Sequence, residues 1–234
     1  MIQSELIARS PLRILERSTR GGLGKGNLGV IAARRGVGKT ACLVHIATDQ
    51  LLRGKQVVHV SFASNSGHII DWYEDIFREI SSRFNLEAAM KVHDDIVRHR
   101  IIMNFNQEGV GLARVMASVR TLIREGHFSA DSIVVDGYDF GRSRAEELTE
   151  VRGFAKELGL EIWFAASLGY EQPRYNAAGF PELLEPFIPE IDVLICLRPV
   201  ESHVRLQLVK DHDTPGPPDL HLNLDPRTLL IAEE

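Results

Sequence analysis

Apolar residues recur at two different spacings along the chain, and the alternation of these spacings predicts an α/β fold. Short runs of branched apolar residues are typical of buried strands, whereas apolar residues three or four positions apart indicate helices. The expected strands cover residues 28–33, 56–62, 100–105, 132–136, 160–166, 193–197, 203–209, 220–224 and 228–231. Helical spacing is found at residues 43–51, 72–84, 86–98, 112–122 and 143–158.

Strands and helices alternate through the first two-thirds of the chain, which predicts a mainly parallel, twisted sheet with helices on both faces. The last strands are expected to be antiparallel, at the C-terminal edge of that sheet. Residues 170–189 are rich in Pro, Gly and Asn, so we expect a surface loop with one short helix. Ser143 and Glu146 have the spacing of a capping box and are expected to open the helix that stops at Gly159.

Residues 27–53 read as a strand, a glycine loop and a helix that Gly54 ends. The loop nearly matches the phosphate-binding pattern G-x-x-x-x-G-K-[ST] (Walker A), with Ala33 at the first glycine position. Glycines let main-chain N–H groups approach a triphosphate, and the positive end of the helix attracts it. We expect Lys39 to reach the β- and γ-phosphates and Thr40 to ligate Mg²⁺. The predicted nucleotide contacts are Arg35, Gly36, Val37, Gly38, Lys39, Thr40 and Ala41.

A second candidate for the metal site is Asp136, which ends the apolar run Ser132-Ile133-Val134-Val135. Proteins with a phosphate-binding loop use a carboxylate at the tip of a neighbouring strand to hold Mg²⁺. The predicted metal residues are therefore Thr40 and Asp136. An ordinary aspartate that caps the loop after a strand is the alternative interpretation of Asp136.

The composition, 44% apolar and 25% charged over 234 residues, is that of a globular protein. The length fits a single domain at residues 21–234 behind a basic segment at residues 1–20. A net charge of −5 gives no global basic field for nucleic acid. No apolar run approaches the ~20 residues of a membrane span, so we expect a cytoplasmic protein with no membrane partner. Cys42 and Cys196 are far apart and imply neither a disulfide framework nor a zinc site.

Four arginines recur at helical spacing in the N-terminal segment: Arg9, Arg13, Arg17 and Arg20. Such a stripe fits a basic helix face that contacts a neighbour or nucleic acid. It fits a solvated helix face as well, and Pro11 interrupts it. Both interpretations stay open at this point.

The entry to the first strand, Gly21-Gly22-Leu23-Gly24-Lys25-Gly26-Asn27-Leu28, resembles the GGLPKGSL-type approach of KaiC-like proteins. The loop AARRGVGKTA is similar to that of replicative helicases, in which alanine also replaces the first glycine. The stretches VVHVSF, RIIMNF, SIVVDGYD, IWFAASL and VKDHDTPGPPDLHLNLDP follow in matching order. The chain thus resembles the RecA-like ATPases, in their KaiC and DnaB-type helicase branch. The resemblance implies a RecA-like P-loop fold that binds ATP, often in homo-oligomeric rings or filaments with nucleotide near the subunit interface.

The departures from this family concern catalysis. The family places a water-polarising glutamate just after the second strand, where this chain has Ala63 or Ser64. Other P-loop families place the base directly after the metal-binding aspartate, where this chain has Gly137. Neither alanine nor glycine can polarise a water. Substitute groups on the next helix are Asp71, Glu74, Asp75 and His68.

Two further polar positions of the family also differ. A sensor glutamine is usual after the strand at residues 162–166, but here Ser167 is followed by Leu168. The helicases use Lys-x-Arg to contact a neighbour's γ-phosphate; this chain keeps Lys210 but has His212 at the arginine position. An arginine finger contributes about 10³–10⁵ in rate where it has been measured. These losses predict weak or absent hydrolysis.

Three hypotheses follow. The first is a Mg²⁺–ATP-binding protein with weak or absent hydrolysis, at most a slow ATPase, which uses nucleotide as a regulatory or interface ligand. The second is an active DNA-linked ATPase related to replicative helicases or recombinases. The third is an interaction protein that has lost nucleotide binding. The intact Gly38-Lys39-Thr40 and Asp136 count against the third, and the negative charge counts against the second.

Overall fold

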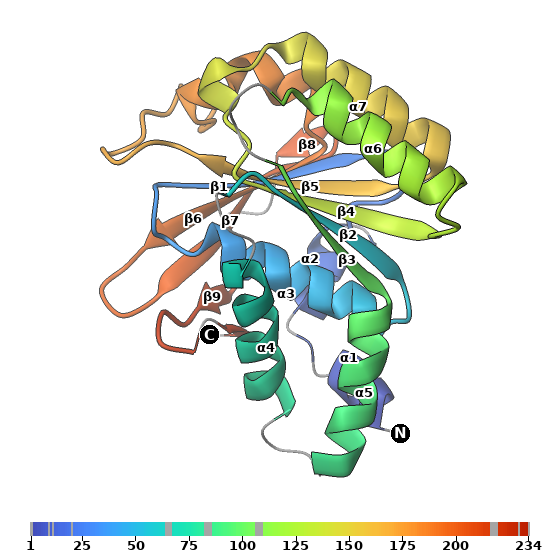
Figure 1. Ribbon diagram of the computed structural model, residues 1–234. Helices are drawn as coiled ribbons and strands as arrows, with labels where there is room; N and C mark the ends of the chain where they lie inside the picture. The colour runs from blue at the N-terminus through green and yellow to red at the C-terminus, as the bar shows by residue number, and fades with distance from the viewer. Residues whose placement is uncertain are drawn as a thin grey trace.

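The structure is a computed structural model that describes residues 2–8, 10, 12–19, 21–63, 67–81, 86–105, 110–215, 220–228 and 230–233. Its centre is a twisted sheet in the order β10-β9-β7-β6-β1-β5-β4-β2-β3 (Figure 1). The parallel part consists of β1 (Leu28–Ala33), β2 (Gln56–Ser61), β3 (Arg100–Asn104), β4 (Ala130–Asp136), β5 (Glu161–Ser167) and β6 (Val193–Pro199).

The remaining strands extend this sheet in antiparallel fashion beyond β6. They are β7 (Val204–Asp211), β8 (Thr214–Pro215), β9 (Leu222–Leu224) and β10 (Ile231–Glu233). The prediction of an α/β fold with a mainly parallel sheet and antiparallel strands at the C-terminal edge is therefore confirmed. The last strand was expected at residues 228–231 but lies later, because residues 225–228 form a turn around the Asp225 carboxylate.

Helices cover both faces of the sheet, as Figure 1 shows. One face carries α3 (Lys39–Leu52), α4 (Gly67–Ser81) and α5 (Leu86–Arg98), with α1 (Ile2–Ala8) and α2 (Leu12–Ser18) beside them. The other face carries α6 (Leu112–Arg124), α7 (Ala145–Leu158) and the 3₁₀ helix η2 (Glu182–Glu190). Two apolar cores result, one on each side of the sheet.

Strand β1 shows why the sequence forms this layered arrangement. All six of its residues are buried. Leu28, Val30 and Ala32 point into the core under α6 and α7, whereas Ile31 and Ala33 point into the core under α3. A strand that is covered on both faces needs apolar residues at successive positions, which explains its uninterrupted apolar run.

The register of the parallel strands brings the carboxyl ends of β1, β2, β4 and β5 to one edge of the sheet. Ala33 of β1 lies opposite Ser167 of β5, and Ser61 of β2 lies opposite Asp136 of β4. Strand β5 separates β1 from β4. Ligands of open α/β sheets bind at the carboxyl ends of the strands, so this edge is where a site is expected.

The helix boundaries bear out two expected stops and correct one expected start. Gly54 has a left-handed φ of 75° just after Arg53, the C-cap of α3, and Gly159 has a left-handed φ of 64° at the C-cap of α7, as predicted. Ser143 does not open α7, because its hydroxyl donates to the Asp139 carbonyl of the preceding 3₁₀ turn η1 (Phe140–Arg142). The helix begins one residue later, where the Glu147 carboxylate accepts the Arg144 N–H at 3.2 Å.

The N-terminal basic stripe does not form one solvated face. Arg13 pairs with Glu16 and with the buried Asp49 of α3 in the same chain. Leu12 and Leu15 of α2 pack into the α3 core. Arg17 is exposed, and Arg9 and Arg20 lie outside the described residues. Of the helices in the described parts of the chain, none combines the length and apolarity needed to cross a membrane.

Candidate functional site

The glycine loop lies between β1 and α3, at the carboxyl edge of the sheet. Gly36 and Gly38 have φ values of 81° and 107°, a backbone region in which side chains are strained. No side chain caps α3, whose first N–H groups have no partner within the helix. Free N–H groups and the positive helix end make this loop able to receive an anion.

The structure brings Thr40 and Asp136 together. The Thr40 hydroxyl donates to Oδ2 of Asp136 at 2.9 Å, across the intervening strand β5. The Asp136 carboxyl is half-buried, and this burial raises its pKa, an effect that its hydrogen bond from Thr40 and the Lys39 charge oppose. Oxygen ligands of this kind suit Mg²⁺, which takes few ligands from proteins and the others from phosphates and water.

Lys39 stands next to this pair. Its ammonium donates to the Arg34 carbonyl at 2.9 Å and to the Ala33 carbonyl at 3.3 Å. Burial lowers the pKa of Lys39, and the Arg35 charge adds to this, whereas Asp136 raises it. The ammonium is thus at the loop, next to Asp136, where an anion would meet it.

The other predicted contact residues have separate environments. Arg35 is exposed, its N–H donates to the Gly169 carbonyl at 2.9 Å, and its guanidinium lies over the Tyr170 ring at 5.2 Å. Val37 packs partly against the α3 core. The Ala41 side chain is fully buried, so only its main-chain N–H can contribute to a site.

A cleft of about 860 Å³ opens over this loop, within the size range of ligand pockets. Residues 35–40, Ala63 and the segment 136–139 line it. Its other lining residues are Trp72, Ala165, Ser167, Gly169, Pro199, Val204, Leu224 and Pro226. A phosphate chain alone would fill only part of this cleft. The rest of the cleft, along its apolar lining residues, has room for a larger organic group.

The two positions at which P-loop families carry the water-polarising residue lie in the cleft, but neither holds a base here. Ala63 and Gly137 both line it, and Ser64 lies outside the described residues. The substitutes considered on α4 are not among the cleft residues: Glu74 bonds His93 at 2.8 Å and Asp75 pairs with Arg78 at 3.1 Å. Asp71 and His68 are exposed and are not among the described residues that line the cleft.

Sequence reasoning missed one acidic residue of the cleft. Asp139 lines it three residues after Asp136. Its Oδ1 accepts the Gly141 N–H at 3.0 Å and its Oδ2 lies 3.5 Å from the Arg142 guanidinium. The repeated aspartate in Asp136-Gly137-Tyr138-Asp139 was the available signal. Its carboxylate is already engaged in the turn that follows.

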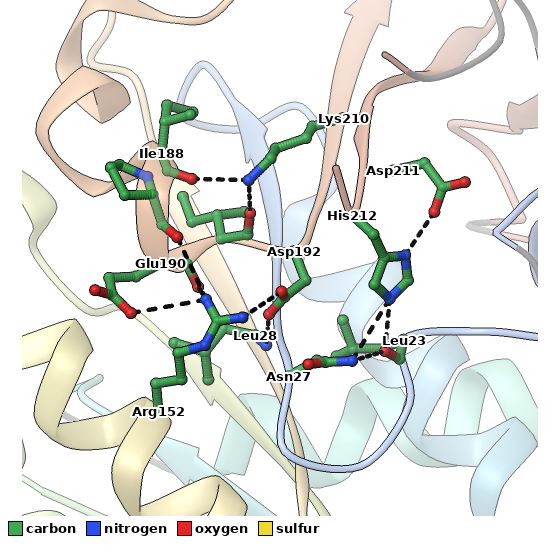
Figure 2. A network of polar contacts seen from close by, with 12 residues as sticks. Leu23, Asn27, Leu28, Arg152, Ile188, Glu190, Asp192, Lys210, Asp211 and His212 are labelled. Carbon is green, nitrogen blue, oxygen red and sulfur yellow. Dashed lines mark hydrogen bonds and ion pairs between the residues drawn. The ribbon is translucent and has the colours of Figure 1, made fainter. Parts of the chain in front are cut away.

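Lys210 and His212 lie at the opposite edge of the sheet, beside the amino ends of β6 and β1. Figure 2 shows their polar contacts. Lys210 lies opposite Leu194 at the start of β6, and His212 directly follows β7. The start of β6 in turn pairs with the start of β1. The Lys210 ammonium donates to the carbonyls of Ile188 (2.9 Å) and Ile191. His212 contacts Asp211 at 2.7 Å and the Leu23 carbonyl at 3.2 Å. Within one chain, neither residue reaches the cleft.

A buried carboxylate organises this opposite edge. Asp192 accepts the Leu28 N–H at 2.8 Å and an Arg152 guanidinium N–H at 2.5 Å (Figure 2). Arg152 of α7 also donates to the Glu190 carbonyl at 3.0 Å. The network joins β1, η2 and α7, and it explains the buried charge without invoking a ligand.

No protein-family model matches this sequence, and no curated protein matches it either.

Proposed function

We propose that this protein binds ATP with Mg²⁺ in the cleft above residues 36–40, as a RecA-like protein would. The observation that carries the proposal is the 2.9 Å hydrogen bond between the Thr40 hydroxyl and Asp136, directly beside a glycine loop at a helix N-terminus. The main-chain N–H groups and Lys39 would hold the phosphates. Thr40 and Asp136 would hold the metal ion, which neutralises phosphate charge when bound.

Hydrolysis is weak or absent in this proposal. The acidic residues in the described lining of the cleft are Asp136, which belongs to the metal site, and Asp139, which caps a turn. Positioned proton transfer contributes typically 10²–10⁴-fold to a rate, and its loss leaves binding intact. Bound nucleotide would then act as a regulatory ligand, or as an interface ligand in a homo-oligomer.

The test is thermal unfolding of the purified protein with ATP, with Mg²⁺ and with both. A ligand that binds only the folded state stabilises it by about 2.7 kcal/mol at 100 times its dissociation constant. We expect Mg²⁺ and ATP together to raise the melting temperature, and Lys39→Ala to remove the rise. An equal melting temperature with and without Mg²⁺–ATP would refute the proposal.

A second candidate function, a DNA-linked ATPase, has one observation in its favour. Tyr170 is 73% exposed beside the phosphate loop, with the Arg35 guanidinium over its ring. Exposed aromatic and arginine side chains are the groups on which single-stranded bases stack. Single-stranded DNA that binds at low salt, and binds more weakly to Tyr170→Ala, would favour this function. No binding at low salt would remove it.

A further inference from the structure

The C-terminal strands form one wall of the cleft. Leu224, the last residue of β9, and Pro226, which follows it, both line the cleft on the side of Gly38. Leu224 is 1% exposed. A Cβ atom built on Gly38 would lie 2.3 Å from Cδ2 of Leu224, a separation that atoms do not adopt. The leucine side chain therefore lies directly on the last glycine of the phosphate loop.

The same strands contact α3 at a second point. The Ile231 N–H of β10 donates to Nε2 of His45 at 3.3 Å. His45 lies on α3, the helix whose first turn follows Gly38. The C-terminal strand pair therefore holds this helix near its start and again further along.

The strand pair itself has a narrow attachment to the sheet. Strand β9 pairs with β7 through Val204 opposite Leu224 and Arg205 opposite Asn223. Beyond β9 there is only β10, paired at three positions, at the end of the described sheet. The pairing of these strands with the sheet is short, so their docking depends largely on the apolar side chains that they bury, Leu224 among them. Contacts at the loop can therefore shift that docking.

We infer that Leu224 is a positioning residue of the phosphate loop, and that nucleotide binding and docking of the C-terminal strands stabilise each other. The inference rests on the proposed function. Gly38 has a left-handed φ, and the Leu224 side chain fills the space beside it where a side chain of residue 38 would lie, so Leu224 packs against the loop in this conformation. A ligand that needs the loop in this conformation must favour the docked strands, because coupling between two sites is reciprocal.

Leu222 provides a matched control for Leu224. The two leucines lie two positions apart on β9, point into the same core and are both fully buried. Leu222 does not line the cleft. Replacing either by alanine removes the same atoms from the same core, but only Leu224→Ala removes the contact with Gly38.

The experiment is calorimetric titration of Mg²⁺–ATP into wild-type protein, Leu224→Ala, Leu222→Ala and Leu224→Met. We expect Leu224→Ala to bind about tenfold more weakly, within the range of ordinary coupling between sites. The dissociation constants of Leu222→Ala and Leu224→Met for Mg²⁺–ATP should stay within about twofold of wild type. The first variant keeps Leu224 on Gly38, and the second replaces it with a side chain of similar size. Equal weakening by the two alanine variants would overturn the inference, and so would unchanged affinity of Leu224→Ala.

Hydrogen exchange tests the same coupling without a substitution in the C-terminal strands. Mg²⁺–ATP should slow amide exchange in residues 222–228 and 230–231, and it should not do so in Lys39→Ala. Binding without any slowing there would overturn the inference alone. Wild-type protein that binds no Mg²⁺–ATP would overturn the proposed function, and the inference with it.

Discussion

The Thr40 hydroxyl of α3 and the Asp136 carboxylate at the end of β4 meet at 2.9 Å, although β5 lies between β4 and β1, the strand that leads to α3. The contact exists because β1 and β4 run in the same direction and end at the same edge of the sheet. It joins the first turn of α3 to the tip of β4. The partial burial of the Asp136 carboxylate should lower the free energy of unfolding, and this effect can be measured.

Asp136→Asn is expected to stabilise the ligand-free protein. Burial raises the pKa of Asp136 in the folded state, so folding takes up protons there, and the carboxylate reduces stability at pH above its unfolded pKa. Removing the charge should raise the melting temperature at neutral pH, by roughly 2–4 °C for each 1 kcal/mol gained. The gain should vanish at acidic pH, where the carboxyl is protonated in both states.

The same variant should lose the stabilisation by Mg²⁺–ATP. Asp75→Asn is a suitable control, because Asp75 pairs with Arg78 on the exposed surface of α4. That change should alter stability by less than about 0.5 kcal/mol. A ligand-free Asp136→Asn protein that melts below wild type would contradict the first prediction.

Ala63→Glu should increase ATP hydrolysis. Ala63 lines the cleft at the end of β2, so a carboxylate introduced there would face the site. Positioned bases contribute typically 10²–10⁴-fold, and we expect at least about a tenfold rise in phosphate release because the new base is not optimised. Ala63→Leu adds comparable bulk without a base and should give no rise. Equal rates for the two variants would exclude position 63 as the site of the missing base.

Arg13→Met should destabilise the fold. Asp49 is 5% exposed and its carboxylate pairs with Arg13, so the substitution leaves a buried charge without its main partner. The expected loss is about 2–4 kcal/mol by denaturant unfolding, and Asp49→Asn in the same chain should restore part of it. Arg17→Met on the same helix is the control, since Arg17 is exposed. Similar losses of stability in Arg13→Met and Arg17→Met would mean that the Arg13–Asp49 pair contributes little to the free energy of unfolding.

Lys210→Met should lower stability and leave nucleotide binding unchanged. The ammonium donates to the Ile188 and Ile191 carbonyls, and an unsatisfied buried polar group costs about 1–3 kcal/mol. Chemical unfolding and Mg²⁺–ATP titration of the same preparation measure the two effects. If Lys210 instead served a neighbour's nucleotide, mixing the variant with wild type would lower hydrolysis beyond simple dilution.

Both thiols should resist modification in the native protein. Burial raises the pKa of Cys42 and of Cys196 to about 12, so neither forms the reactive thiolate near neutral pH. A disulfide reagent should leave both thiols unmodified until denaturant unfolds the chain, and then titrate two. Rapid reaction of a native thiol would indicate local opening of the sheet near α3 or β6.

The sequence predicts the part of the molecule in which local pattern and tertiary structure agree. The apolar run of β1, the apolar residues Ile133-Val134-Val135 of β4 and the glycine loop between β1 and α3 lie where spacing alone placed them. The meeting of Thr40 with Asp136 follows from parallel strands that share an edge. Whether nucleotide occupies the cleft stays a prediction.

The rest of the site depends on contacts that no local pattern encodes. Trp72 and Tyr170 approach the loop only through tertiary packing. Leu224 lies on Gly38 because the antiparallel strands turn back toward α3. Arg13 finds Asp49 through the docking of α2, so charge spacing alone could not distinguish a free basic face from an ion-paired one.

Asp192 has a consequence for how the molecule can move. It accepts the N–H of Leu28, the first residue of β1, and ties that strand to Arg152. This contact adds to the pairing of β1 with β5 and β6, so the strand is held at its first residue and along its length. The glycines come after Ala33, beyond this pairing, so the backbone of this segment has most freedom to adjust at the loop.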